Sequence, residues 1–195
     1  NQAQGAAFNV VIAGGFRRYT CGSSVSPGNS ASAGTMGALV ADDTGQIYGL
    51  TNNHVTGLCN HSLIGVPILA PGVLDVAPGV QHPFTIGLHR TVLEMSVGTQ
   101  GNIEVARNSD AAIFSIIAPD TVSSLQGGLY DTPEVAVDPV EGMIVEKVGR
   151  TTGYTRGKIV GRELGPINVH YSSTEYGFTG NILFDNTWVV HGDGE

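Results

Sequence analysis

Glycine is the residue that most restricts how this chain can fold. Twenty-eight of its 195 residues are glycine, and Gly, Pro, Asn, Asp or Ser interrupts the apolar runs along the chain. Glycine destabilises helix interiors, and no stretch keeps the 3.6-residue apolar period of an amphipathic helix. The pattern therefore predicts an all-β sandwich or barrel made of short strands and tight turns.

The expected strands are short runs rich in Val, Ile, Leu, Phe or Tyr. They cover residues 8–12, 36–40, 46–51, 63–69, 102–106, 111–117, 143–148, 158–162, 167–171 and 182–191. The sequence Ala-Asp-Asp-Thr-Gly at 41–45 predicts a hairpin turn, because Asp and Gly tolerate positive φ. At 131–142, two prolines and four acidic residues interrupt the strands. We expect a linker there between two β units, residues 1–135 and 136–195.

Charge and hydropathy exclude two classes of partner. Nine basic residues against seventeen acidic ones give a net charge of -8, so nucleic acid is not an expected partner. No apolar run approaches the roughly 20 residues that a membrane-spanning helix needs, so no membrane partner is expected. The chain begins with Asn1, which allows for a removed signal or pro-segment. The compartment stays open, with secretion favoured over the cytoplasm.

The two cysteines, Cys21 and Cys59, are too few for a disulfide scaffold or a four-cysteine zinc site. Two alternatives stay open, a single bridge between them or two separate buried thiols. His54, Cys59 and His61 lie within eight residues, but their spacing matches no familiar zinc site. The glycine-rich segment that ends at Gly157 and Lys158 lacks the spacing of a phosphate-binding loop. We therefore expect no metal and no cofactor.

Two polar residues stand where a strand meets a turn. His54 follows the apolar run at 46–51, and Asp110 immediately precedes the run at 111–117. A serine-type hydrolase needs a base, a carboxylate that orients the base, a nucleophile and donors for the oxyanion. His54 and Asp110 are candidates for the first two roles. Taken singly, each is better explained as an ordinary turn residue, and only their order and contexts favour the catalytic interpretation.

The contexts of the two residues carry a resemblance. The segments GTMGALVADDTGQIYGLTNNHV, SDAAIFSI and VEKVGRTTGYTRGKIVG occur in that order between residues 34 and 161. Together they resemble the bacterial-type branch of the trypsin-like, chymotrypsin-fold serine peptidases. The resemblance implies two antiparallel six-stranded Greek-key barrels, with His54 as general base and Asp110 as orienting acid. It also implies a polypeptide substrate that is hydrolysed through an acyl-enzyme.

The sequence departs from that family at the nucleophile. The family carries it in a Gly-Asp-Ser-Gly loop, which does not occur here, and the chain ends in Gly-Asp-Gly-Glu. We therefore expect the second barrel to be incomplete and a C-terminal chain or segment to supply the closing strands and the serine. An end at Glu195 suggests self-cleavage by an enzyme that prefers Glu, with His170 or His191 as partner for the substrate carboxylate.

Two other classes of function stay open. The chain can be a catalytically inactive trypsin-like module that only binds, in which the missing serine reflects loss of chemistry. It can also be a β-rich surface or structural protein with a chance His/Asp pair. Substrate specificity and the activation mechanism lie beyond what the sequence indicates.

Overall fold

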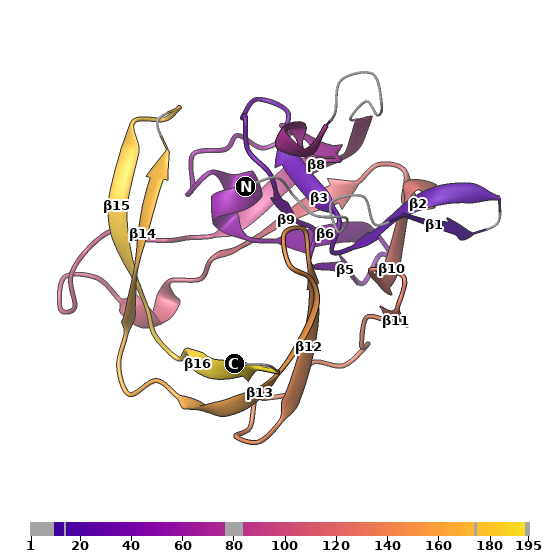
Figure 1. Cartoon of the computed structure of the whole chain (residues 1–195). Helices are drawn as coiled ribbons and strands as arrows, with labels where there is room; N and C mark the ends of the chain where they lie inside the picture. Colours follow the sequence, from indigo (N-terminus) through magenta and orange to yellow (C-terminus); the bar gives the residue numbers. More distant parts are fainter. Residues whose placement is uncertain (1–9, 14, 77–83, 174, 194–195) are drawn as a thin grey trace.

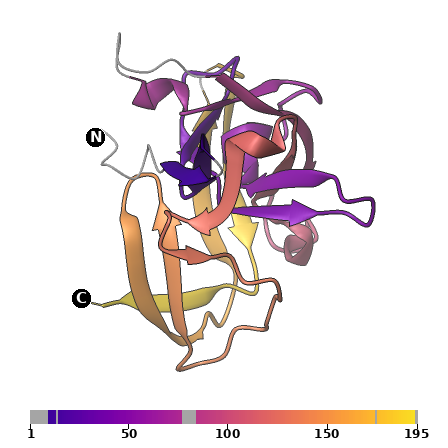
Figure 2. The ribbon, with the colours of Figure 1, turned by 90° about the vertical axis from the view of Figure 1, so that its right-hand side faces the viewer.

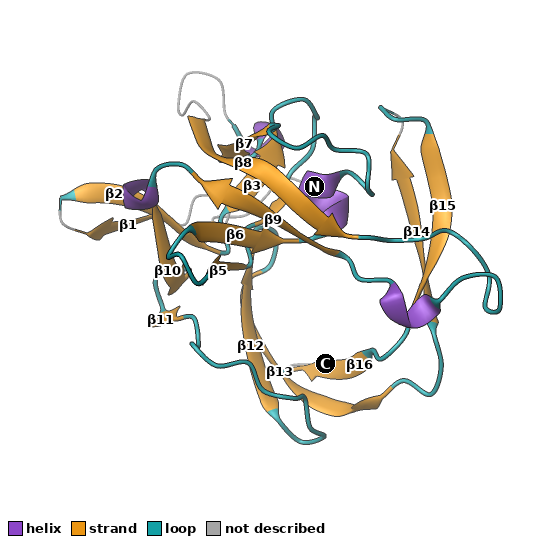
Figure 3. Cartoon of the chain, turned by 180° about the vertical axis from the view of Figure 1, so that it is seen from behind, coloured by secondary structure: helices purple, strands orange, loops and turns teal. Residues whose placement is uncertain are grey.

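The computed structural model describes residues 10–13, 15–76, 84–173 and 175–193. Within these ranges the chain is all-β, and helix is confined to single turns between strands (Figure 3). These turns are η2 (Asn53–Gly57), η3 (Val73–Asp75), η4 (Val105–Arg107) and η5 (Pro119–Thr121). The expected fold class is confirmed at the level of an all-β protein with a curled antiparallel sheet.

The largest sheet has seven strands and curls into a half-barrel (Figure 1). Its order is β4 (Gly34–Thr35), β3 (Ser24–Pro27), β7 (Pro67–Ala70), β8 (Phe84–Leu93), β9 (Ala111–Ile116), β6 (Ile47–Thr51) and β5 (Ala38–Ala41). Neighbouring strands in it are antiparallel. The curled sheet encloses the main hydrophobic core.

Phe114 of β9 is the largest fully buried side chain of that core. Burial alternates along β9, which places Ala112, Phe114 and Ile116 on the inner face. The Phe114 ring is fully buried and lies against two glycines of neighbouring strands. An added Cβ would come within 2.2 Å of the ring at Gly49 and within 2.6 Å at Gly87. The glycines therefore make room for the ring, as close packing requires.

Three smaller sheets complete the described fold. The first has the order β1 (Val10–Ala13), β2 (Phe16–Cys21), β10 (Val122–Gln126) and β11 (Tyr130–Asp131), with β10 parallel to β2. The second has the order β12 (Ile144–Gly149), β13 (Gly153–Arg162) and β16 (Trp188–Gly192). The third is the hairpin of β14 (Ile167–Ser173) and β15 (Phe178–Phe184).

In the view of Figure 1, the β14–β15 hairpin stands to the left of the half-barrel, and β12, β13 and β16 lie below it. Figure 2 shows β12 and β13 from the side, beneath the first sheets. Among the described strands, no ladder joins β1–β11 to β12–β16; one isolated bridge links Val97 to Ile182. The proposed division at 1–135 and 136–195 stays a prediction.

Within the described residues, β12 and β16 each pair only with β13. Each therefore presents one edge without a strand partner, and such an edge is a template for another strand. Ile144 of β12 and Val190 of β16 are 47% and 46% exposed. This three-stranded sheet is only partly covered.

The hairpin expected at 41–45 is confirmed. β5 and β6 pair across it, the Gly45 amide donates to the Asp42 carbonyl at 2.9 Å, and Gly45 has a φ of 83°. The Asp42 carboxylate also accepts from the amides of Thr44 and Gln46. Gly45 takes the positive φ on which the prediction rested, and the Asp42 side chain adds hydrogen bonds that hold the turn.

Several strand predictions were wrong or incomplete. The run at 102–106 is not a strand, because the chain turns at Gly101 and continues into η4. The run at 63–69 is a strand only from Pro67, since Gly65 has a φ of 88°. The run at 182–191 is divided by a turn at Asn186, whose φ is 57°. Residues 8 and 9 of the first predicted strand lie outside the described residues.

One strand lies where the sequence predicts none. β8 covers residues 84–93 and lies inside the sheet between β7 and β9. Asp75 is buried, with 8% exposure.

No helix among the described residues is long and apolar enough to cross a membrane.

A buried ion pair joins the half-barrel to the β12–β13 turn. Arg150 donates from Nε to Asp75 Oδ2 at 2.6 Å and from Nη2 to Oδ1 at 2.8 Å. The side chains of Arg150 and Asp75 are 16% and 1% exposed. Ser24 Oγ also donates to Asp75, and the Arg150 amide donates to Thr35 Oγ1 at 3.0 Å. The turn at Arg150 is therefore fixed to the first strands by side chain and backbone.

Candidate active site

The sheet register brings His54 and Asp110 together. β6 and β9 are adjacent antiparallel strands in which Thr51 pairs with Ala112. The chain leaves β6 at Thr51 and enters β9 at Ala111, so both residues lie at the same end of this strand pair. Asn52 strengthens the junction by donating from Nδ2 to the Asp110 carbonyl at 2.8 Å. The predicted proximity of His54 and Asp110 follows from this local geometry.

Asp110 contacts His54 with both carboxylate oxygens. Oδ1 accepts from the His54 amide at 2.9 Å, and Oδ2 accepts from the His54 Nδ1 at 2.6 Å. The Asp110 side chain is 16% exposed, whereas the imidazole is 44% exposed. The Asp110 carboxylate is therefore fixed by two hydrogen bonds and largely shielded from solvent, whereas the His54 imidazole remains accessible to solvent.

The electrostatics keep Asp110 ionised. Burial raises the pKa of Asp110. Three effects outweigh burial and bring the pKa below its ordinary value: hydrogen bonds from the His54 side chain and amide, the electrostatic interaction with His54, and the hydrogen bond from the Tyr171 hydroxyl. An ionised carboxylate only accepts hydrogen bonds, so Nδ1 of His54 carries the proton. The second ring nitrogen, Nε2, is then the basic one. It accepts no hydrogen bond from any residue that the structure describes.

A turn of π-helix presents His54. η2 begins directly after β6 and Asn52, and single π turns often occur at functional sites. Asn53, which is fully buried, donates from Nδ2 to Asn60 Oδ1 at 2.6 Å and to the Leu93 carbonyl at 2.9 Å. The Asn60 amide donates back to Asn53 Oδ1 at 3.0 Å. These bonds fix the loop that follows His54.

That loop has an unusual backbone. Leu58, Cys59 and Asn60 have φ values of 50°, 55° and 74°, in the left-handed region that non-glycine residues rarely adopt. At Gly57, an added Cβ would come within 2.3 Å of Asn53 Oδ1. A strained backbone conformation of this kind persists only where surrounding contacts hold it in place. Here the hydrogen bonds between Asn53 and Asn60 hold it.

Tyr171 is a site residue that the sequence analysis did not single out. Its hydroxyl donates to Asp110 Oδ2 at 3.1 Å, and its ring lies 5.6 Å from the His54 ring between centroids. It comes from β14, 61 residues from Asp110 along the chain. Its alternating position in an expected strand is the only signal in the sequence, and it does not indicate which surface the ring contacts.

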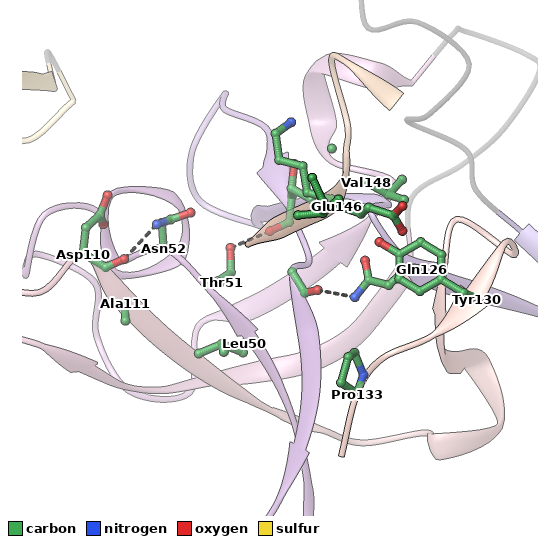
Figure 4. Close-up of a pocket in the computed structure, with 15 residues that line it drawn as sticks. Leu50, Thr51, Asn52, Asp110, Ala111, Gln126, Tyr130, Pro133, Glu146 and Val148 are labelled. Atoms are coloured by element: carbon green, nitrogen blue, oxygen red, sulfur yellow. Dashed lines mark hydrogen bonds between the residues drawn. The ribbon is translucent and has the colours of Figure 1, made fainter. Parts of the chain in front are cut away.

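Two hollows lie beside the pair. The larger, of about 860 Å³, is bounded by Asp110 and Asn52 at one end and by Gln126 and Tyr130 at the other (Figure 4). Its remaining wall includes β12, from Ile144 to Gly149. The smaller, of about 250 Å³, is lined by His54, Cys59, Tyr171 and the tip of the β14–β15 hairpin. The pair therefore lies between two hollows, with Asp110 on the wall of the larger and His54 on the wall of the smaller.

The other candidate residues do not join the pair in a metal site. No group of three or more His, Cys, Asp or Glu side chains among the described residues could hold a metal ion. His61 Nδ1 donates to the Leu58 and Cys59 carbonyls at 3.0 and 2.8 Å. His170 Nδ1 contacts Asn181 Oδ1 at 2.9 Å. His191 lies on β16, and neither His170 nor His191 lines the two hollows.

The cysteines are separate buried thiols in the structure, which answers the question that the sequence left open. Cys21 ends β2, where Thr132 Oγ1 contacts its sulfur at 3.9 Å. Cys59 packs with Met95 and Ile182 in a second hydrophobic cluster beneath the β14–β15 hairpin. Burial and the charge of Asp110 raise the pKa of Cys59 to about 11, so it is a packing residue and not a nucleophile at neutral pH.

Comparison with known proteins adds no assignment to this geometry: no protein-family model matches the chain, and no curated protein matches it.

Proposed function

We propose that this chain supplies the general base and the orienting acid of a trypsin-like serine endopeptidase. The observation that carries the proposal is the 2.6 Å hydrogen bond from His54 Nδ1 to Asp110 Oδ2, with Nε2 left without a hydrogen-bond partner among the described residues. A carboxylate on one nitrogen, largely shielded from solvent, and an accessible second nitrogen are what a base for an alcohol nucleophile requires.

The reaction is hydrolysis of a peptide bond through an acyl-enzyme. His54 Nε2 takes the proton of a serine hydroxyl as the oxygen attacks the scissile carbonyl, and then gives that proton to the leaving amine. Water attacks the ester in the second half of the reaction, again with His54 as base. Asp110 stays ionised throughout, holds the ring in one tautomer and stabilises the imidazolium.

The nucleophile comes from a separate polypeptide segment. We propose that a C-terminal chain or segment adds strands to the free edges of β12 and β16 and brings the serine to Nε2 of His54. Two findings support this: the half-covered sheet of β12, β13 and β16, and the hollow of about 860 Å³ between β12 and the half-barrel. The completed molecule would have the two Greek-key barrels of the chymotrypsin fold.

A second candidate function is binding without cleavage. It is favoured by the edges of β12 and β16 that have no strand partner among the described residues. In this case an extended peptide pairs with the edge of β12 or β16 by strand addition and is released unchanged.

The test uses the natural polypeptide that contains residues 1–195. The protein is treated with a fluorophosphonate probe, the labelled residue is mapped by mass spectrometry, and hydrolysis of a peptide panel is measured. We expect label on a serine outside residues 1–195 and cleavage that is lost in His54→Ala. Asp110→Asn should lower kcat by about 10⁴-fold, because the ring loses its fixed tautomer.

Asp120→Asn is the matched control for Asp110→Asn, because the Asp120 side chain is 86% exposed and lies outside the two hollows, and it should leave the rate unchanged. Label on a serine within residues 1–195 would show that the nucleophile is not supplied from elsewhere. A folded protein that takes no label and cleaves no peptide, yet binds peptides from the panel, would replace the peptidase proposal with the binding function.

A further inference from the structure

Asp110 Oδ2 accepts hydrogen bonds from two residues. One is the His54 Nδ1 at 2.6 Å, and the other is the hydroxyl of Tyr171 at 3.1 Å. The other oxygen, Oδ1, is taken by the His54 amide at 2.9 Å. Both oxygens therefore have donors, and Tyr171 is the only one of the described residues outside the His54 turn whose side chain donates to this carboxylate.

The phenol is held firmly in this position. Burial alternates along β14, which places Tyr171 on its inner face. The Tyr171 ring lies 5.6 Å from the His54 ring and 6.3 Å, edge to face, from the Phe184 ring. It also packs against the cluster of Cys59, Met95 and Ile182. The hydroxyl therefore approaches Asp110 from a packed ring, and little entropy is lost in making the bond.

Tyr171 remains a donor at neutral pH. Burial, the charge of Asp110 and the hydrogen bond to it all raise the pKa of the phenol above its ordinary value. A neutral phenol beside an ionised carboxylate can only donate to it, since the carboxylate has no proton to give. Hydrogen bonds to charged groups are stronger than those between neutral groups.

We propose that Tyr171 is a positioning residue for the His54–Asp110 pair, which it orients through Asp110 Oδ2. The inference rests on the proposed function, in which the carboxylate must point at Nδ1 of His54. Donors from two separate elements, the His54 turn and β14, fix the rotation of the Asp110 carboxylate about its Cβ–Cγ bond. Because Tyr171 belongs to the β14–β15 hairpin, correct docking of that hairpin becomes a condition for a well-oriented base.

The docking of the hairpin is visible at its tip. Ser30 Oγ donates to Glu175 Oε2 at 2.7 Å, and the Ala31 amide donates to Oε1 at 3.1 Å. Asn108 Nδ2 donates to the Leu183 carbonyl at 2.9 Å on the second strand. These contacts tie both ends of the hairpin to the half-barrel and hold β14 against Asp110.

The test is Tyr171→Phe in the natural polypeptide, which removes the hydroxyl and keeps the ring packing. We expect kcat to fall about tenfold with KM unchanged, the usual scale for one hydrogen bond to a charged group. The proton resonance of His54 Nδ1–H, observed by NMR, should move or broaden because Oδ2 then has one donor. The control is Tyr176→Phe, whose hydroxyl contacts Asn29 at the exposed tip.

The two readouts separate this inference from the proposed function. If no peptide is cleaved but the Nδ1–H resonance moves in Tyr171→Phe and not in Tyr176→Phe, the positioning contact stands and the peptidase proposal fails. An unchanged resonance and an unchanged kcat in a folded Tyr171→Phe protein would overturn the inference. Equal losses in both variants would assign the effect to hairpin packing and would overturn it too.

Discussion

Replacement of Arg150 by Met should strongly destabilise the protein. The change removes both donors that Arg150 gives to Asp75 and leaves a carboxylate whose side chain is 1% exposed. Ser24 would be its remaining side-chain donor. Loss of one partner of a buried ion pair costs about 3–5 kcal/mol, because the other charge stays buried without compensation. We expect a loss of that size in the free energy of unfolding.

The assay is urea unfolding followed by the fluorescence of Trp188, the one tryptophan in the chain. With a slope of about 2 kcal/mol per molar urea, the midpoint should fall by about 1.5–2.5 M. Arg107→Met is the matched control, because Arg107 pairs with Glu104 at the surface, where the side chains are 80% and 73% exposed. An exposed pair of this kind contributes about 0–1 kcal/mol.

Two further measurements test the reasoning. The double variant of Arg150→Met and Asp75→Leu should be more stable than Arg150→Met alone, because no buried charge is left. Burial raises the pKa of Asp75, but the hydrogen bonds from Arg150 and Ser24 and the charge of Arg150 bring it below its ordinary value. The native state therefore binds a proton at Asp75 less readily than the unfolded chain does. Stability rises with pH between the pKa of Asp75 in the folded protein and its ordinary pKa.

The contribution of the pair is complete above the ordinary Asp pKa of about 3.9 and is lost as the pH falls through the lower pKa of the folded protein. Arg150→Met should flatten this acid limb of the stability curve. The reasoning would be refuted if the free energy of unfolding of Arg150→Met lay within about 0.5 kcal/mol of that of the unaltered protein and the acid limb were the same. A buried carboxylate without a charged partner should cost more than that.

Two other predictions concern the loop after His54 and the thiols. Gly57→Ala should lower the free energy of unfolding by about 1–3 kcal/mol through overpacking against Asn53. Gly165→Ala is the control, because an added Cβ there meets nothing within 4 Å. Its free energy of unfolding in the same urea assay should lie within about 0.5 kcal/mol of that of the unaltered protein. Alkylation of the denatured, non-reduced protein should modify both Cys21 and Cys59, because both are free in the structure; a single labelled thiol or none would contradict this.

The fold class was predictable because its signals are local. Burial alternates along β9 in step with its sequence, and the turn at 41–45 is held by its own Asp42. β8 was missed because its apolar alternation, at Phe84, Ile86 and Leu88, ends at Arg90, and a register shift lies between His89 and Thr91. Its ten residues form a strand because β7 and β9 pair with it on both sides, which is tertiary context that propensity does not include.

The site was predictable to the same extent. His54 and Asp110 each stand at the end of a recognisable strand, and the pairing of β6 with β9 brings the two residues together. Two contacts that the sequence did not reveal join distant segments: Asp75 with Arg150 and Asp110 with Tyr171, 75 and 61 residues apart. Such contacts depend on how separate sheets dock, and no local pattern encodes the docking.

The position of Asp110 depends on both kinds of contact. Its Oδ1 is fixed by the His54 amide, a bond that β6 and β9 determine between themselves. Its Oδ2 is shared between His54 and Tyr171, so its orientation also depends on a hairpin that no strand ladder joins to the half-barrel within the described residues. A change that loosens this hairpin without unfolding the half-barrel should therefore leave the His54 and Asp110 backbones in place while weakening the alignment of their side chains. On this reasoning, the part of the chain that the sequence identifies positions the base, and the part that it does not identify determines how well the base is oriented.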